Sequence, residues 1–281
     1  MKKIPILLFL TIYSLFLQSD KLSIVTTINP YYMIVCELAG STADVYNLVP
    51  PNASPHTYNP TPKDMVKLEQ ADIIIMNGLG LEEHIADYLK QMKRNPIIIS
   101  NVFPDSINRS EINPHIWLSA PILITAIEMI DSALKAEDLE NHQTYDSISS
   151  LYKDRIVRID SLITAERKNY GEIDIVTFHN SFDYFCSRYN INVAGTFEKS
   201  PGKEPTAKQM KELADIIKLK NIQVLYSEPQ LNKSMAELLA NEMNIGIDIL
   251  DPLGTYFECK SVDEILLSNW KEIEKNLKEK K

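Results

Sequence analysis

Short apolar runs alternate with amphipathic stretches along the chain, and this alternation restricts its fold more than any other feature of the sequence. Four apolar runs of the first half predict strands: 22–27, 44–49, 72–77 and 96–100. Helical patterns lie between them: 30–40, 61–71 and 81–92. A repeated β-α-β-α order of this kind predicts a parallel sheet with helices on both faces.

The same alternation starts again after Gly171. Predicted strands and helices follow one another in this order: strand 172–178, helix 181–189, strand 191–197, helix 206–220, strand 222–227, helix 234–243, strand 245–250 and a final helix from Ser261. The two halves are alike in pattern, although no residue-level repeat relates them. We therefore expect two α/β lobes, each with a parallel sheet flanked by helices.

A long helical stretch lies between the halves. After a helical pattern at 119–136, residues 139–169 contain neither proline nor glycine, and their apolar residues recur at helical spacing. This stretch exceeds the usual length of a globular helix. We expect it to be one long rigid helix at 139–170 that joins a first lobe, 20–138, to a second lobe, 171–281.

The first residues have the pattern of a secretory signal. Lys2 and Lys3 precede an apolar run at 4–17, which is shorter than a membrane-spanning helix and suits a signal peptide. We predict a signal peptide at 1–19 and a periplasmic mature chain; an uncleaved anchor is the alternative. No cysteine lies near this junction, so a lipid anchor is not expected.

Charge and composition restrict the ligand class. The chain carries a net charge of −9, and without Lys2 and Lys3 the mature chain has 27 basic residues against 38 acidic ones. An acidic surface argues against nucleic acid and anionic membranes. The sequence contains neither GxGxxG nor GxxxxGK[ST], so a nucleotide site is not expected.

Three cysteines, Cys36, Cys186 and Cys259, match no zinc-ribbon or CxxC motif. Cys186 and Cys259 are the candidate pair for a disulfide, and two unpaired thiols are the favoured interpretation.

Four side chains follow predicted strands: His56, His115, His179 and Asp251. Ligands of open α/β sheets bind beyond the carboxyl ends of the strands, so these side chains converge if each lobe contributes two. His84 and His142, by contrast, lie within charged or polar helical stretches and are expected at the surface. Glu228 also follows a strand, and we keep it as an outer-sphere residue or an alternative ligand.

Three imidazoles and one carboxylate form a suitable set for a divalent first-row metal. Imidazole suits zinc, and the Irving–Williams order places zinc above manganese. Zinc is therefore the expected ion, with manganese and iron as alternatives. Because protons compete for imidazole nitrogens, we expect affinity to fall near pH ~6.

Five segments together resemble one family, the periplasmic solute-binding proteins of zinc and manganese ABC transporters. They are SPHTYNPTPKDM (54–65), NPHIWLS (113–119), VTFHNSFDYF (176–185), YSEPQ (226–230) and LDPLG (250–254). The resemblance implies two lobes joined by a rigid helix, with His56 and His115 from the first and His179 and Asp251 from the second as ligands. It also implies an ABC permease of the inner membrane as partner, a monomer, and no enzymatic activity.

Many zinc-specific members carry a histidine-rich loop before the second ligand, and residues 101–114 contain no histidine. Some relatives with three histidines and one aspartate accept manganese or iron.

Three rival functions stay open at this point. Three histidines with a nearby carboxylate also describe a zinc hydrolase, although Asp251 as fourth ligand would close the coordination shell. A binding protein of the same architecture could hold a siderophore or tetrapyrrole, which leaves the strand-end histidines unexplained. An adhesin role is compatible with metal binding.

Overall fold

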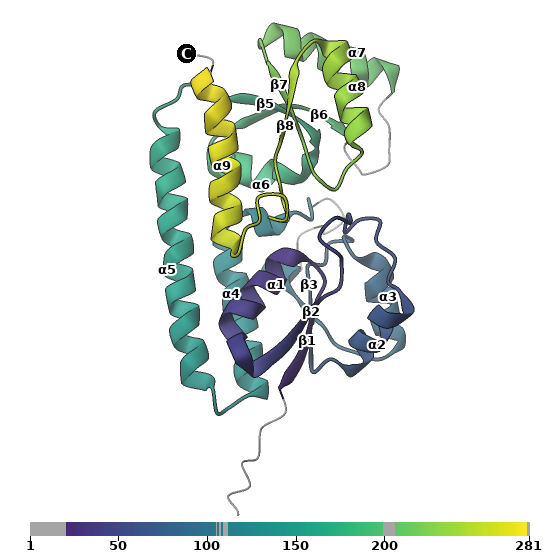
Figure 1. Cartoon of the computed structure of the whole chain (residues 1–281), viewed down its shortest axis with the longest axis vertical. Helices are drawn as coiled ribbons and strands as arrows, with labels where there is room; N and C mark the ends of the chain where they lie inside the picture. Colours follow the sequence, from purple (N-terminus) through teal and green to yellow (C-terminus); the bar gives the residue numbers. More distant parts are fainter. Residues whose placement is uncertain (1–20, 105, 107, 109–111, 199–205, 280–281) are drawn as a thin grey trace, which may run out of the picture.

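The computed structural model describes residues 21–104, 106, 108, 112–198 and 206–279 (Figure 1). The predicted signal peptide at 1–19, its cleavage point and part of the histidine-free loop at 101–114 lie outside these residues. Within them, no helix combines the length and apolar character needed to cross a membrane.

The first lobe is built on a parallel sheet of strand order β2-β1-β3-β4. Its elements are β1 (Leu22–Thr26), α1 (Asn29–Ala39), β2 (Ala43–Asn47), α2 (Pro62–Gln70), β3 (Ile73–Met76), α3 (Glu83–Gln91) and β4 (Ile97–Ile98). Strand β3 is buried along its whole length, as expected for a parallel strand covered on both faces. Helix α2 begins with a capping box between Thr61 and Asp64.

The second lobe repeats this arrangement with the strand order β6-β5-β7-β8, again all parallel. Its elements are β5 (Asp174–His179), α6 (Asp183–Arg188), β6 (Asn192–Glu198), α7 (Ala207–Leu219), β7 (Val224–Ser227), α8 (Lys233–Met243) and β8 (Gly246–Ile249). In each lobe the second strand pairs beside the first, and the third lies on its other side. The predicted fold class is therefore confirmed.

Three long helices also lie within the described residues: α4 (Ala120–Glu137), α5 (His142–Arg167) and α9 (Val262–Glu279). Helix α5 runs along one side of both lobes, with α9 beside it (Figure 1). Its 26 residues span about 39 Å. One hydrophobic core extends through these helices from the first lobe into the second, so the lobes share buried packing.

Arg155 of α5 links this helix to α1 and α9. Its guanidinium donates two hydrogen bonds of 2.7 Å to the Glu37 carboxylate on α1, and Nε donates to Asp263 of α9 at 2.9 Å. The same guanidinium lies 4.3 Å from the centre of the Tyr152 ring. This ion cluster links the first lobe to α5 and to the C-terminal helix.

Strand β4 is shorter than the predicted strand 96–100. Within the described part of the chain it pairs only with β3, and beyond Ile98 the chain turns into a 3₁₀ helix, Ile99–Val102, that buries Ile99 completely. A strand at the edge of a sheet has hydrogen-bond partners on one side only, which favours this early turn. The three cysteines are free thiols, as favoured from the sequence; Cys186 and Cys259 are not bonded.

Candidate metal centre

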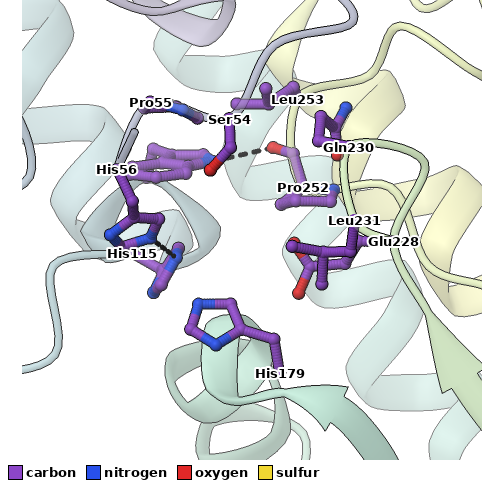
Figure 2. Close-up of a pocket in the computed structure, with 11 residues that line it drawn as sticks. Ser54, Pro55, His56, His115, His179, Glu228, Gln230, Leu231, Pro252 and Leu253 are labelled. Carbon is purple, nitrogen blue, oxygen red and sulfur yellow. Dashed lines mark hydrogen bonds between the residues drawn. The ribbon is translucent and has the colours of Figure 1, made fainter. Parts of the chain in front are cut away.

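His56, His115 and His179 meet between the lobes. His56 lies in the loop between β2 and α2, His115 lies just before the 3₁₀ turn Ile116–Leu118, and His179 is the last residue of β5. One ring nitrogen from each histidine lies within 4.8 Å of those of the other two. Figure 2 shows the three rings pointing into one pocket. The predicted convergence of these residues is thus present in the structure.

The rings are packed closely. Nε2 of His56 lies 3.0 Å from Nε2 of His115. The ring centre of His179 lies 5.3 Å from the ring centre of His56 and 5.0 Å from that of His115. Nitrogen ligands of a tetrahedral zinc ion, bound at about 2.0–2.1 Å, lie roughly 3.3–3.4 Å apart. The spacing of the His56 and His115 nitrogens is close to that value.

Hydrogen bonds fix the tautomer of His179. Its Nδ1 lies 3.1 Å from the backbone carbonyl oxygen of Glu198. A carbonyl oxygen can only accept, so in the neutral ring Nδ1 carries the proton and Nε2 carries the lone pair. This Nε2 is buried and has no hydrogen-bond partner within the described part of the chain. A buried acceptor of this kind is costly until a hydrogen-bond donor or a cation binds it.

Burial lowers the pKa of all three histidines. The pKa of His56 falls to about 4, because of burial and then the neighbouring His179. The pKa of His115, 3% exposed, falls well below its ordinary value because of burial and the other two rings. Burial also lowers the pKa of His179. The site thus stays unprotonated to lower pH than ordinary imidazoles, and the expected loss of affinity near pH ~6 moves downward.

The pocket around the rings is completed mainly by the second lobe. Glu228, Leu231 and Pro252 line it beside His179 (Figure 2). From the first lobe, the Trp117 ring centre lies 5.2 Å from that of His115, and its Nε1 donates to the Pro252 carbonyl oxygen at 2.7 Å. Trp117, Leu231 and Pro252 thus place largely apolar surface around the three rings.

Asp251 has a different position from the histidines. It is fully buried after β8, but among the described residues it does not belong to the group whose ligand atoms gather within 4.8 Å. Its Oδ1 accepts from the Leu253 backbone N–H at 3.1 Å, and its Oδ2 accepts from that of Tyr256 at 2.6 Å. In this structure the carboxylate therefore holds the turn that follows β8.

Glu228 lines the pocket directly. Its Oε1 accepts a 2.6 Å hydrogen bond from the Ser181 hydroxyl, and burial raises the pKa of its carboxyl to about 8. The remaining histidines, His84 on α3 and His142 on α5, lie at the surface away from the cluster, as predicted.

A profile of the ZnuA family, described as the periplasmic component A of zinc-uptake complexes, matches residues 24–275. The chain belongs to this family. It is 33% identical over 281 residues to a provisionally named metal-binding protein of Thermotoga maritima, covering 99% of this chain and 100% of that protein. It is 26% identical to the high-affinity zinc uptake system protein ZnuA of Bacillus subtilis, covering 84% of this chain and 80% of the relative.

Among solved structures, a crystal structure of ZnuA superposes with a TM-score of 0.78 and 26% identity, covering 90% of this chain and 100% of that one. The two-lobed architecture is therefore that of the ZnuA family.

The sequence analysis did not single out Asn113, which contacts a histidine of the cluster. Asn113 lies two residues before His115 and accepts a 2.6 Å hydrogen bond from its Nδ1. The motif NPHIWLS contains it, but a lone asparagine in a loop gives no signal until the partners of its amide are known.

Proposed function

We propose that this protein captures one divalent transition-metal ion in the periplasm, zinc in the first place, and delivers it to the permease of an ABC transporter. The observation that carries this proposal is the convergence of three imidazoles, two buried (His115 and His179) and one half-buried (His56), whose ligand atoms lie within 4.8 Å of one another. Neutral imidazole is the ligand that zinc prefers among nitrogen donors. Membership of a family of uptake-complex components supports the delivery step.

We assign His56, His115 and His179 as ligands and Asp251 as the fourth, with Glu228 as the alternative. A carboxylate has about four lone-pair sites, so Asp251 could keep a backbone N–H while one oxygen binds the ion. Glu228 already lines the pocket but would have to lose its proton. In both cases one negative charge offsets part of the charge of the ion.

A full set of four protein ligands favours a carrier over an enzyme, because a catalytic zinc keeps a position for water. Trp117, Leu231 and Pro252 line the same pocket, so a bound ion would lie among largely apolar side chains. We expect the carrier to act as a monomer, with the permease as its protein partner.

Elemental mass spectrometry on the purified mature chain tests the site. We expect about one zinc per chain, lost in H115A and retained in H84A, whose histidine is exposed on α3. One manganese or iron ion per chain would support metal capture but show that the assignment of zinc is wrong. No metal in wild type, after incubation with all three ions, would reject the site and favour an organic ligand.

The two carboxylates are distinguished by a matched pair of variants. D251A and E228A are titrated with zinc, and zinc K-edge absorption counts the ligands. If Asp251 is the fourth ligand, D251A should lose more zinc affinity than E228A. The absorption spectrum of D251A should then show a water in place of one protein oxygen ligand. The reverse order would assign the fourth position to Glu228. A bound water already present in wild type would favour the hydrolase.

Delivery is tested in cells that lack the gene for this chain. We expect wild type and H84A to restore growth in zinc-depleted medium and H115A to fail, with all three exported in equal amounts. Restoration by H115A would reject capture at this site as the transport step.

A further inference from the structure

The side chain of Asn113 uses every hydrogen-bonding group that it has. Its Oδ1 accepts from the backbone N–H of His115 at 3.0 Å and from the Nδ1 of the same residue at 2.6 Å. Its Nδ2 donates to the backbone carbonyl oxygen of Asn180 at 2.6 Å and to Oδ2 of Asp183 at 2.7 Å. An asparagine amide offers two donors and two lone pairs, so none is left over.

These partners fix which way the amide faces. Asn180 and Asp183 present only acceptor oxygens, so the NH₂ group must face them and Oδ1 must face His115. The Nδ1 of a neutral His115 must then carry the proton, and its Nε2 carries a lone pair directed at the site. The contacts of the Asn113 amide with Asn180 and Asp183 therefore set the tautomer in which His115 can bind a metal.

Asn113 also bridges the two lobes. It precedes His115 by two residues in the first lobe, whereas Asn180 directly follows His179 in the second. The backbone carbonyl oxygen of Asn113 accepts a further hydrogen bond, 3.0 Å long, from the Tyr184 hydroxyl of α6. One residue thus connects the segments that carry histidines from opposite lobes.

We propose that Asn113 is a positioning residue with two separable actions: it holds His115 in the Nδ1–H tautomer, and it holds the His115 and His179 segments at ion-binding distance before the ion arrives. This inference rests on the proposed function of metal capture. Partners behind metal-ligating histidines commonly change metal affinity by about 10–100-fold when they are removed.

Two substitutions separate the two actions. In N113D the new carboxylate still accepts from Nδ1 of His115, but it cannot donate to the Asn180 carbonyl oxygen and it faces the like-charged Asp183. In N113A both actions are lost. The variant D183N keeps an acceptor oxygen for the amide of Asn113, so it serves as the matched control.

The first experiment measures the His115 tautomer by ¹H–¹⁵N correlation of imidazole nitrogens in the metal-free protein. We expect the Nδ1–H form in wild type and N113D, and a mixture with the Nε2–H form in N113A. A purely structural role would leave the tautomer of N113A unchanged, and that result would overturn the first action. This readout needs no metal, so it stands apart from any failure of the proposed function.

The second experiment measures the rate of zinc release to a chelator by stopped flow. We expect release about 10-fold faster in N113D than in wild type, and a rate near that of wild type in D183N. The double variant N113D/D183N should recover slow release, because the new amide at position 183 can donate to the new carboxylate at position 113. Release from N113D at the wild-type rate, or no recovery in the folded double variant, would overturn the bridging action.

Discussion

Nε2 of His56 and Nε2 of His115 lie 3.0 Å apart, and Nδ1 of His115 already donates to Asn113. In the neutral state His115 therefore directs a lone pair at the nitrogen of His56. Only a proton on His56 or a cation between the rings makes this contact favourable. In the metal-free protein a neutral His56 supplies that proton in its Nε2–H tautomer and donates to His115, whereas an ion bound by both nitrogens requires His56 to carry its proton on Nδ1.

The first prediction concerns metal-linked stability. Zinc that binds the folded chain alone should stabilise it by about 4 kcal/mol at a free concentration 1,000 times its dissociation constant. We expect H56A to lose this gain, because it removes one nitrogen of the 3.0 Å pair. H142A is the control, since its histidine pairs with Asp146 at the surface of α5. Thermal unfolding with and without zinc measures the effect, and an equal gain in H56A would contradict it.

The second prediction concerns pH. The pKa of His56 is about 4 in the folded chain against 6.5 for an ordinary histidine, so the unfolded chain takes up the proton first as the pH falls. The stability of the metal-free protein should be complete above about pH 6.5 and decline between pH 6.5 and 4, by about 3 kcal/mol for this residue.

Urea unfolding across this range checks the slope, which should be shallower in H56A. A wild-type stability that does not change between pH 6.5 and 4.5 would show that the rings are not held neutral. Zinc affinity should likewise persist below pH 6, where free imidazoles already begin to lose it to protons.

The third prediction concerns Glu228. Burial raises the pKa of its carboxyl from 4.5 to about 8, so its contribution to stability is complete below pH 4.5 and is lost as the pH rises through 8. E228Q imitates the protonated acid. We expect it to be more stable than wild type at pH 8.5 by about 2–4 kcal/mol and equal to it at pH 4.5. E83Q, on the exposed surface of α3, should show no such pH dependence.

The strands were predictable because each apolar run is short and is followed by a helical pattern. The convergence of the three histidines was predictable because each follows a predicted strand, His179 directly and His56 and His115 across loops. What the pattern could not give is the environment of each side chain. The backbone partners of Asp251 come from a turn that folds back on it, and those of Asn113 come from the other lobe. Both sets of partners depend on tertiary packing, which cannot be inferred from the spacing of residues along the chain.

The edge strand shows the same limit on a smaller scale. The three isoleucines of residues 96–100 predict a strand over the whole segment, yet the chain leaves the sheet after Ile98. Ser100 donates its backbone N–H to the Asn77 carbonyl oxygen, and Gly78 packs against its side chain. The end of β4 is therefore decided by a neighbouring loop.

The fourth prediction concerns Arg155. R155A removes two hydrogen bonds to Glu37, one to Asp263 and a contact with the Tyr152 ring, and should cost about 1–2 kcal/mol of unfolding free energy. R155K should recover little of this loss, because an ammonium cannot form the paired hydrogen bonds. R158A, on the exposed face of the same helix, is the control. Additive losses in R155A, E37A and their double variant would show that the pair is not coupled.

The last prediction concerns the loop that carries His56. Asp64 is 2% exposed, and its carboxylate accepts from the hydroxyls of Tyr46 at 2.8 Å and Tyr58 at 2.7 Å, and from the Thr61 backbone N–H at 2.6 Å. Burial alone would raise the pKa of this carboxyl, but these hydrogen bonds outweigh it and lower the pKa. The carboxylate thus caps α2 and holds Tyr58, two residues after His56.

D64A should therefore act in two ways. It should cost about 2–4 kcal/mol of stability, because a helix cap and buried charge-assisted hydrogen bonds are lost. It should also weaken zinc binding, because the His56 loop is released, whereas D87A on the exposed surface of α3 should change neither property. Urea unfolding and zinc titration at a temperature where D64A stays folded measure the two effects. Lower stability with unchanged zinc affinity would show that other contacts position His56.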